Sequence, residues 1–152
     1  MSKSIVLLDT GFWISLLDPT DERKKTADAE EIAEIIEDEI LIVPYPTLYE
    51  FVSSRLSRRE AVIEFEKLLY RPNIECLPDT GYKEKALENF FIKTKQSSSD
   101  LSLVDEVIKL ILNDKQRKFD FVVTFDSGLR IEAQSLGIRV LPEDEVYRKR
   151  NY

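Results

Sequence analysis

The sequence predicts an α/β protein, namely a doubly wound sandwich in which a central, parallel, five-stranded sheet is flanked by helices. Five short apolar runs in the chain are typical of strands buried in such a sheet. The segments between them carry apolar residues at helical spacing. Because the chain has only four glycines, it contains neither a phosphate-binding P-loop nor a dinucleotide fingerprint.

Each predicted strand is a short run of mainly aliphatic or aromatic residues. In the first, the segment Ile5–Leu8 holds four aliphatic residues in succession, which indicates burial on both faces in the middle of the sheet. This run ends at Asp9, Thr10 and Gly11, so we expect Asp9 at the carboxyl edge of the sheet, where doubly wound proteins bind their ligands. The five predicted strands cover residues 4–8, 40–43, 73–77, 119–124 and 138–141.

Helical periods fill most of the chain between these strands. An apolar segment runs on from Trp13 to Leu17 and breaks at residues 18–21, and we assign no element to it. The last predicted helix is followed by Gly137, which is typical of a helix C-cap. The predicted helices cover approximately residues 22–38, 47–56, 58–70, 81–95, 101–115 and 129–136.

The length and composition predict one domain over residues 1–152, with a core at about 4–141 and a charged tail at 143–152. No apolar stretch approaches the roughly 20 residues that a membrane helix needs. The N-terminus enters a strand without a signal-peptide pattern, so we expect a cytoplasmic protein that does not contact membranes.

Two compositional features restrict the chemistry. The chain has no histidine and a single cysteine, Cys76, which excludes Ser-His-Asp and Cys-His catalysis, imidazole metal sites and internal disulfides. Its net charge of −7 argues against a passive nucleic-acid binder, which normally presents a basic face. A nucleic-acid enzyme remains open, because metal ions bound by acids can neutralise phosphates locally.

Four acids are placed where they could meet. Asp9 follows the first strand and Asp126 follows the fourth, while Glu50 and Asp105 lie in the first turns of predicted helices. If the first and fourth strands are neighbours, all four side chains face one crevice at the carboxyl edge. Converging carboxylates repel one another, and a hard divalent cation with oxygen ligands, Mg²⁺ or Mn²⁺, resolves that repulsion.

The order of these motifs resembles the PIN domain over about residues 4–141. An apolar strand leads into Asp9-Thr10, Glu50 follows in a helix, and Leu-Ser-Leu-Val-Asp ends at Asp105. Val-Thr-Phe-Asp then ends at Asp126, before a helix bounded by glycines. That family comprises Mg²⁺-dependent ribonucleases, many of them VapC-type toxins of toxin–antitoxin pairs.

The resemblance implies an RNA phosphodiester hydrolase with Mg²⁺ or Mn²⁺ as its cofactor. It also implies a cognate antitoxin as a possible partner and a homodimer as the assembly. By the same resemblance, the metal-binding catalytic acids are Asp9, Glu50, Asp105 and Asp126, and the polar residues that support them are Thr10, Ser102 and Thr124. From position alone, we consider Arg130 and Arg55 as contacts for substrate phosphates.

Structural and functional alternatives remain for the same residues. Thr47-x-x-Glu50 and Ser102-x-x-Asp105 both fit the capping box, in which the acid only satisfies helix amides. Asp9-Thr10-Gly11 and Asp126-Ser127-Gly128 match the paired motif of aspartic proteases, although that fold is all-β and glycine-rich. A third alternative is a non-catalytic, PIN-like module that works by binding other proteins. Chelation of metal would abolish nuclease activity and leave a protease untouched.

Overall fold

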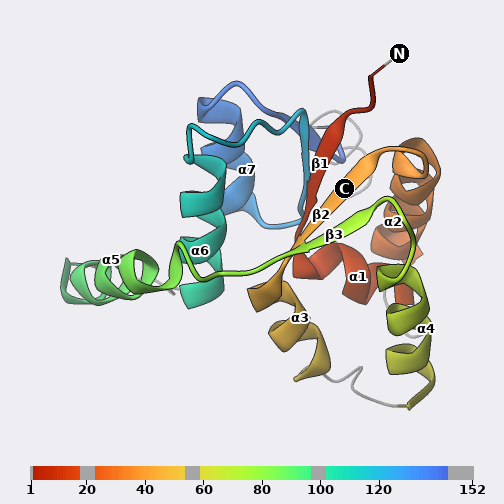
Figure 1. Cartoon of the computed structure of the whole chain (residues 1–152), viewed down its shortest axis with the longest axis horizontal. Coiled ribbons are helices and arrows are strands. Elements are labelled where there is room, and N and C mark those ends of the chain that lie inside the picture. Colours follow the sequence, from red (N-terminus) through yellow and green to blue (C-terminus); the bar gives the residue numbers. More distant parts are fainter. Residues whose placement is uncertain (1, 18–22, 54–58, 97–101, 144–152) are drawn as a thin grey trace.

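The chain folds as an α/β protein around one all-parallel, five-stranded sheet, as predicted (Figure 1). The structure, a computed structural model, describes residues 2–17, 23–53, 59–96 and 102–143, with the backbone alone for 23–27. The strands are β1 (Ile5–Leu8), β2 (Ile40–Pro44), β3 (Ile74–Leu77), β4 (Phe121–Val123) and β5 (Arg139–Leu141).

The strand order β3-β2-β1-β4-β5 places β1 in the centre of the sheet. Leu7 of β1 pairs with Ile42 of β2 on one side, and Leu8 pairs with Val123 of β4 on the other. The first and fourth strands are therefore neighbours, which is the condition under which the four acids were expected to face one crevice. Strand order reverses between β1 and β4, and a crevice opens beyond the carboxyl ends at such a switch point. This parallel α/β sheet is not the all-β fold on which the aspartic-protease alternative depends.

Seven helices surround the sheet in the part of the chain that the structure describes, and they form a layer on each face. Helices α1, α2 and α4 cover one face and α6 and α7 the other, while α5 extends outward beside α6 and α3 lies near the carboxyl edge (Figure 1). None of these helices is both long and apolar enough to cross a membrane. The helices are α1 (Thr10–Leu17), α2 (Arg23–Ile36), α3 (Tyr45–Val52), α4 (Arg59–Leu69), α5 (Lys83–Gln96), α6 (Leu103–Leu112) and α7 (Ser127–Ser135).

The core has two halves, one on each face of the sheet. Successive side chains of a strand point to opposite faces, so Val6 and Leu8 pack among α1, α2 and α4, whereas Leu7 packs against α6 and α7. All three side chains are fully buried, which confirms the double-sided burial predicted for this strand. This packing holds the end of β1, and with it Asp9, in a fixed position.

Most helix boundaries lie within a few residues of the sequence-based assignment, and two differences beside the site have a clear cause. Helix α1 begins at Thr10, directly after β1, where no element was assigned; its buried residues include Phe12, Trp13 and Ser15, so no polar stripe reveals its period. Helix α3 begins at Tyr45 rather than Thr47, because Pro46 fits the first turn, where a missing N–H costs nothing.

Two helix ends agree with the sequence-based assignment. Gly137, with a φ of 76°, follows α7 as predicted, and its N–H donates to the carbonyl of Gln134. The N–H of Ile138 reaches back to the carbonyl of Ala133, which completes the glycine-dependent end of the helix. Ser102 caps the start of α6 by accepting from the N–H of Asp105 at 3.2 Å. Residues 144–152 of the predicted charged tail lie outside the described residues.

Candidate active site

Asp9 lies at the carboxyl end of β1 and is only 7% exposed. Its two carboxylate oxygens accept hydrogen bonds from residues that follow different strands. Oδ1 accepts from the N–H of Thr10 at 2.7 Å, and Oδ2 accepts from the hydroxyl of Thr124 at 2.9 Å. Thr124, which directly follows β4, is fully buried. The pairing of β1 with β4 therefore orients the Asp9 carboxylate through two hydrogen bonds.

Glu50 reaches the same place from α3. Its side chain accepts from the hydroxyl of Thr10 at 2.5 Å, so Thr10 contacts both Asp9 and Glu50. The capping-box interpretation of Glu50 is wrong, because Thr47 lies inside α3 and its hydroxyl donates to the carbonyl of Pro44 at 2.6 Å. Glu50 is exposed and lies on the side of α3 that faces the end of β1.

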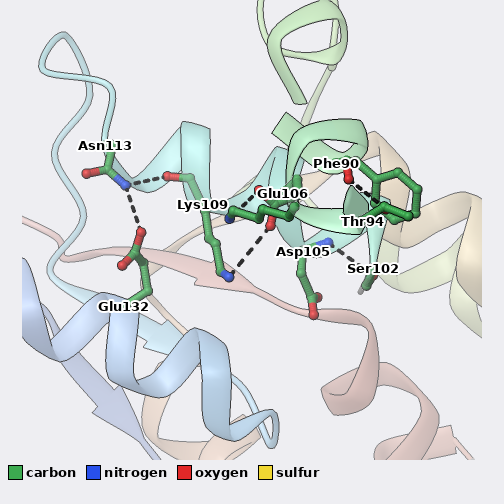
Figure 2. Close-up of polar contacts among 9 residues, drawn as sticks. Phe90, Thr94, Ser102, Asp105, Glu106, Lys109, Asn113 and Glu132 are labelled. Carbon is green, nitrogen blue, oxygen red and sulfur yellow. Dashed lines mark hydrogen bonds and ion pairs between the residues drawn. The ribbon is translucent and has the colours of Figure 1, made fainter. Parts of the chain in front are cut away.

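Asp105 lies in the first turn of α6, with its backbone held by the Ser102 cap. Figure 2 shows the side chains of Asp105 and its neighbour Glu106 pointing in different directions. Glu106 is 3% exposed and pairs with Lys93 of α5 at 2.6 Å and with Lys109 of α6 at 3.6 Å. The ion pair between Lys93 and the buried Glu106 joins α5 to α6 and thereby helps to position the turn that carries Asp105.

Asp126 has a structural role as well as a place in the crevice. Its Oδ2 accepts from the N–H of Leu129 at 2.8 Å and so caps the start of α7. Its own N–H donates to the hydroxyl of Thr124 at 3.0 Å. Thr124 therefore links Asp126 to Asp9, and one carboxylate oxygen of Asp126 serves as the helix cap.

The four acids line one open cavity of about 500 Å³ at the carboxyl edge of the sheet. Asp9, Glu50, Asp105 and Asp126 come from four different segments, and Thr10 and Ser102 line the same space. Gly11, Ile14 and Ser53, which were not predicted as part of the metal site, complete the lining. Ser53 stands three residues after Glu50, so the helical period of α3 is the signal that would have found it. We call this space the acid cavity.

The acids of this cavity influence one another's ionisation. Burial raises the pKa of Asp9 to about 6, opposed by its hydrogen bonds from Thr124 and Thr10 and increased by the charges of Glu50 and Asp126. Burial, followed by the charges of Asp126, Asp9 and Glu50, raises the pKa of Asp105 to about 7, and Lys109 opposes this rise. Mutual repulsion of this kind is the electrostatic condition that a bound cation relieves.

The donor set of the acid cavity suits a hard cation, although it is not arranged as a finished metal site. Carboxylates belong to the oxygen ligands that Mg²⁺ and Mn²⁺ prefer. Within the described residues, no three acidic, histidine or cysteine side chains stand together in a ready arrangement for a metal ion. Uncompensated like charges oppose the closer approach that shared coordination requires.

The two arginines considered for phosphate binding have different outcomes. Arg130 is 7% exposed, donates to the carbonyl of Thr124 at 3.4 Å and does not line the acid cavity. That contact places it beneath the end of β4, where its side chain supports the backbone of Thr124. Arg55 lies outside the residues that the structure describes.

A family model described as the PIN domain matches residues 6–133 of the chain. None of the curated proteins matches the chain. The match spans all four acids of the cavity.

Solved structures share the fold at low sequence identity. VapC20 of Mycobacterium tuberculosis, a sarcin-ricin loop cleaving toxin, is 16% identical with a TM-score of 0.63, over 86% of this chain and 94% of its own. VapBC2 of Rickettsia felis, solved with a DNA fragment from its promoter, is 12% identical with a TM-score of 0.57. This match covers 90% of this chain and 96% of the Rickettsia chain. FitAcB of Neisseria gonorrhoeae is 20% identical with a TM-score of 0.53, and the match covers 89% of this chain and 95% of the Neisseria chain.

Proposed function

Because this chain belongs to the PIN-domain family, we propose that it is a divalent-metal-dependent ribonuclease that hydrolyses RNA phosphodiester bonds in the acid cavity. One observation carries the proposal. Asp9, Glu50, Asp105 and Asp126 are far apart in sequence, yet their side chains line a single cavity at the switch point of the sheet. Ligands of doubly wound proteins bind at this place.

The four carboxylates would hold Mg²⁺ or Mn²⁺. When bound, such an ion polarises a phosphodiester and lowers the pKa of a coordinated water. The remaining contributions come from the protein. Thr124 and Thr10 hold the Asp9 carboxylate in one orientation through their hydrogen bonds, and Thr10 also fixes Glu50.

Asp105 is the acid of the cavity best placed to hold a proton near neutral pH. With a pKa of about 7, its carboxyl group is roughly half protonated at pH 7 in the metal-free protein. Nearby positive charge favours the carboxylate form, so cation binding and proton release at Asp105 are coupled. The positive charge of Lys109 acts in the same direction, because it partly opposes the rise in the pKa of Asp105.

Chelation provides the direct test of metal dependence. We expect the purified protein to cut single-stranded RNA in Mg²⁺ or Mn²⁺, to lose this activity in excess EDTA, and to regain it when the ion is restored, because the bound ion lowers the pKa of the attacking water and stabilises the charge on the phosphodiester. Gel analysis of labelled RNA measures the cleavage. RNA cleavage that continues unchanged in EDTA would contradict the proposal, and cleavage of a protein substrate in EDTA would favour the aspartic protease instead.

We further propose that the enzyme is the toxin of a toxin–antitoxin pair, with a small cognate protein as its inhibitor. The fold likeness to VapC20 and to VapBC2 supports this role. We expect induced expression in bacteria to stop growth, and co-expression of the protein encoded beside it to restore growth. Growth unaffected by the active enzyme would indicate a housekeeping ribonuclease. The homodimer and the cytoplasmic location stay predictions.

A further inference from the structure

A second hollow, of about 340 Å³, lies beside the acid cavity. Helix α3 contributes Tyr49 to it, and α6 contributes Leu103 and Val104. Tyr49 is 56% exposed and Leu103 is 41% exposed, so the apolar surface of this hollow is open to solvent. We call it the apolar groove.

The apolar groove is continuous with the acid cavity. Glu50 and Ser53 line both spaces, so the two hollows share a wall made by one face of α3. A strand of nucleic acid with a phosphate at the four acids therefore brings a neighbouring nucleotide to the groove. Beyond the apolar floor, the groove also contains the oppositely charged side chains Asp79 and Lys83, from the connection between β3 and α5 and from α5.

These features match the chemistry of an unstacked nucleobase. A base has an apolar π-face, which stacks on aromatic rings, and a polar edge of hydrogen-bond donors and acceptors. Tyr49 offers the ring, and Tyr45 supports it through an edge contact with ring centroids 6.4 Å apart. Asp79 offers an acceptor and Lys83 a donor for the edge.

We propose that the apolar groove is the subsite that receives a nucleobase of single-stranded RNA next to the bond being cut, with Tyr49 as its stacking platform. This inference rests on the ribonuclease function proposed above. It makes Tyr49 a specificity-determining residue, since the base that fits the groove selects which phosphodiester reaches the acids.

Three variants of α3 test the proposal. Tyr49→Ala removes the ring, Tyr49→Phe keeps it, and Val52→Ala truncates an exposed apolar residue of the same helix that does not line the groove. Each is assayed in Mg²⁺ on single-stranded RNA with randomised positions, and KM, kcat and the bases flanking the cuts are recorded. Circular dichroism confirms that each variant is folded.

We expect Tyr49→Ala to raise KM roughly 5- to 150-fold, the range that corresponds to the loss of one stacked base, and to broaden the flanking-base preference. Tyr49→Phe and Val52→Ala should retain the wild-type KM and preference. As a second measurement, RNA with an abasic sugar beside the cut should raise the KM of the wild type by the same factor. The abasic sugar should cause no further rise in the KM of Tyr49→Ala.

The outcomes separate this inference from the function on which it rests. If the wild type cuts RNA but Tyr49→Ala matches it in KM and in base preference, the base subsite is refuted and the ribonuclease stands. The same result would leave the apolar groove as a surface for a protein partner. If the wild type does not cut RNA in Mg²⁺ or Mn²⁺, both proposals fall.

Discussion

Asp9→Asn is expected to slow RNA cleavage in Mg²⁺ about a thousandfold or more while the protein stays folded. The substitution removes the charge of the most buried of the four acids and keeps its shape. Asparagine can still accept from the N–H of Thr10, and its amide can donate to the hydroxyl of Thr124, which is free to rotate. Initial rates on labelled RNA at saturating Mg²⁺ measure the effect.

Asp38→Asn is the matched control for this experiment. Asp38 is an exposed aspartate that precedes β2, at the opposite edge of the parallel sheet from Asp9, and it does not line the acid cavity. The Asp38→Asn variant loses the same charge as Asp9→Asn but keeps the acid cavity intact. Its cleavage rate should therefore equal that of the wild type. If Asp9→Asn cuts RNA as fast as Asp38→Asn, the acid cavity is not the catalytic site.

The metal-free protein is expected to become less stable as the pH rises from about 4 to 8. An aspartate in an unfolded chain has a pKa near 3.9, whereas the pKa is about 6 for Asp9 and about 7 for Asp105 in the folded protein. Between these values the folded state binds more protons than the unfolded state, so the free energy of unfolding falls as the pH rises. For Asp9 alone, a pKa difference of about two corresponds to about 2–3 kcal/mol, fully lost above its folded pKa.

Mg²⁺ or Mn²⁺ should reverse this loss, because a cation binds the charged carboxylates of the folded protein and not those of the unfolded chain. Thermal unfolding monitored by circular dichroism at pH 5 and at pH 8, with and without the ion, measures both effects. In EDTA we expect Tm to be about 5–10 °C lower at pH 8 than at pH 5, and Mg²⁺ to raise Tm mainly at pH 8.

A double variant, Asp9→Asn with Asp105→Asn, is the control for the pH effect. It should show a flatter dependence of Tm on pH and little response to Mg²⁺, because the two acids with raised pKa values are gone. A wild-type Tm that rises from pH 5 to pH 8 in EDTA would contradict the raised pKa values of Asp9 and Asp105 in the folded protein. An equal Mg²⁺ response in the wild type and the double variant would place the ion elsewhere.

The strands were the most predictable part of the fold. Strands buried on both faces must be apolar throughout, so runs such as Ile5–Leu8 and Ile40–Pro44 are visible without any tertiary information. Helix α1 was missed for a related reason. It is apolar on several sides and follows β1 with only Asp9 between them, so its sequence could not be distinguished from a continuation of the apolar strand.

The capping motifs show where local sequence stops being informative. Thr47-x-x-Glu50 and Ser102-x-x-Asp105 have the same pattern, but only Ser102 caps a helix, because Pro46 moves the start of α3 ahead of Thr47. Arg130 stands close to Asp126 in sequence, yet its side chain is buried against the Thr124 carbonyl. Sequence distance alone could not separate a cavity residue from a supporting one.

By itself, the sequence determined the fold class, the four acids and the absence of imidazole chemistry, because each follows from residue types and their spacing. Only the tertiary structure decided that the acids share one cavity, since this depends on β1 pairing with β4 across the switch point. It also decided how the acids are held, with Thr124 and Thr10 on Asp9, and that the apolar groove beside them is lined by Tyr49. Pairing between residues more than a hundred positions apart brings those groups together, and no local pattern encodes that contact.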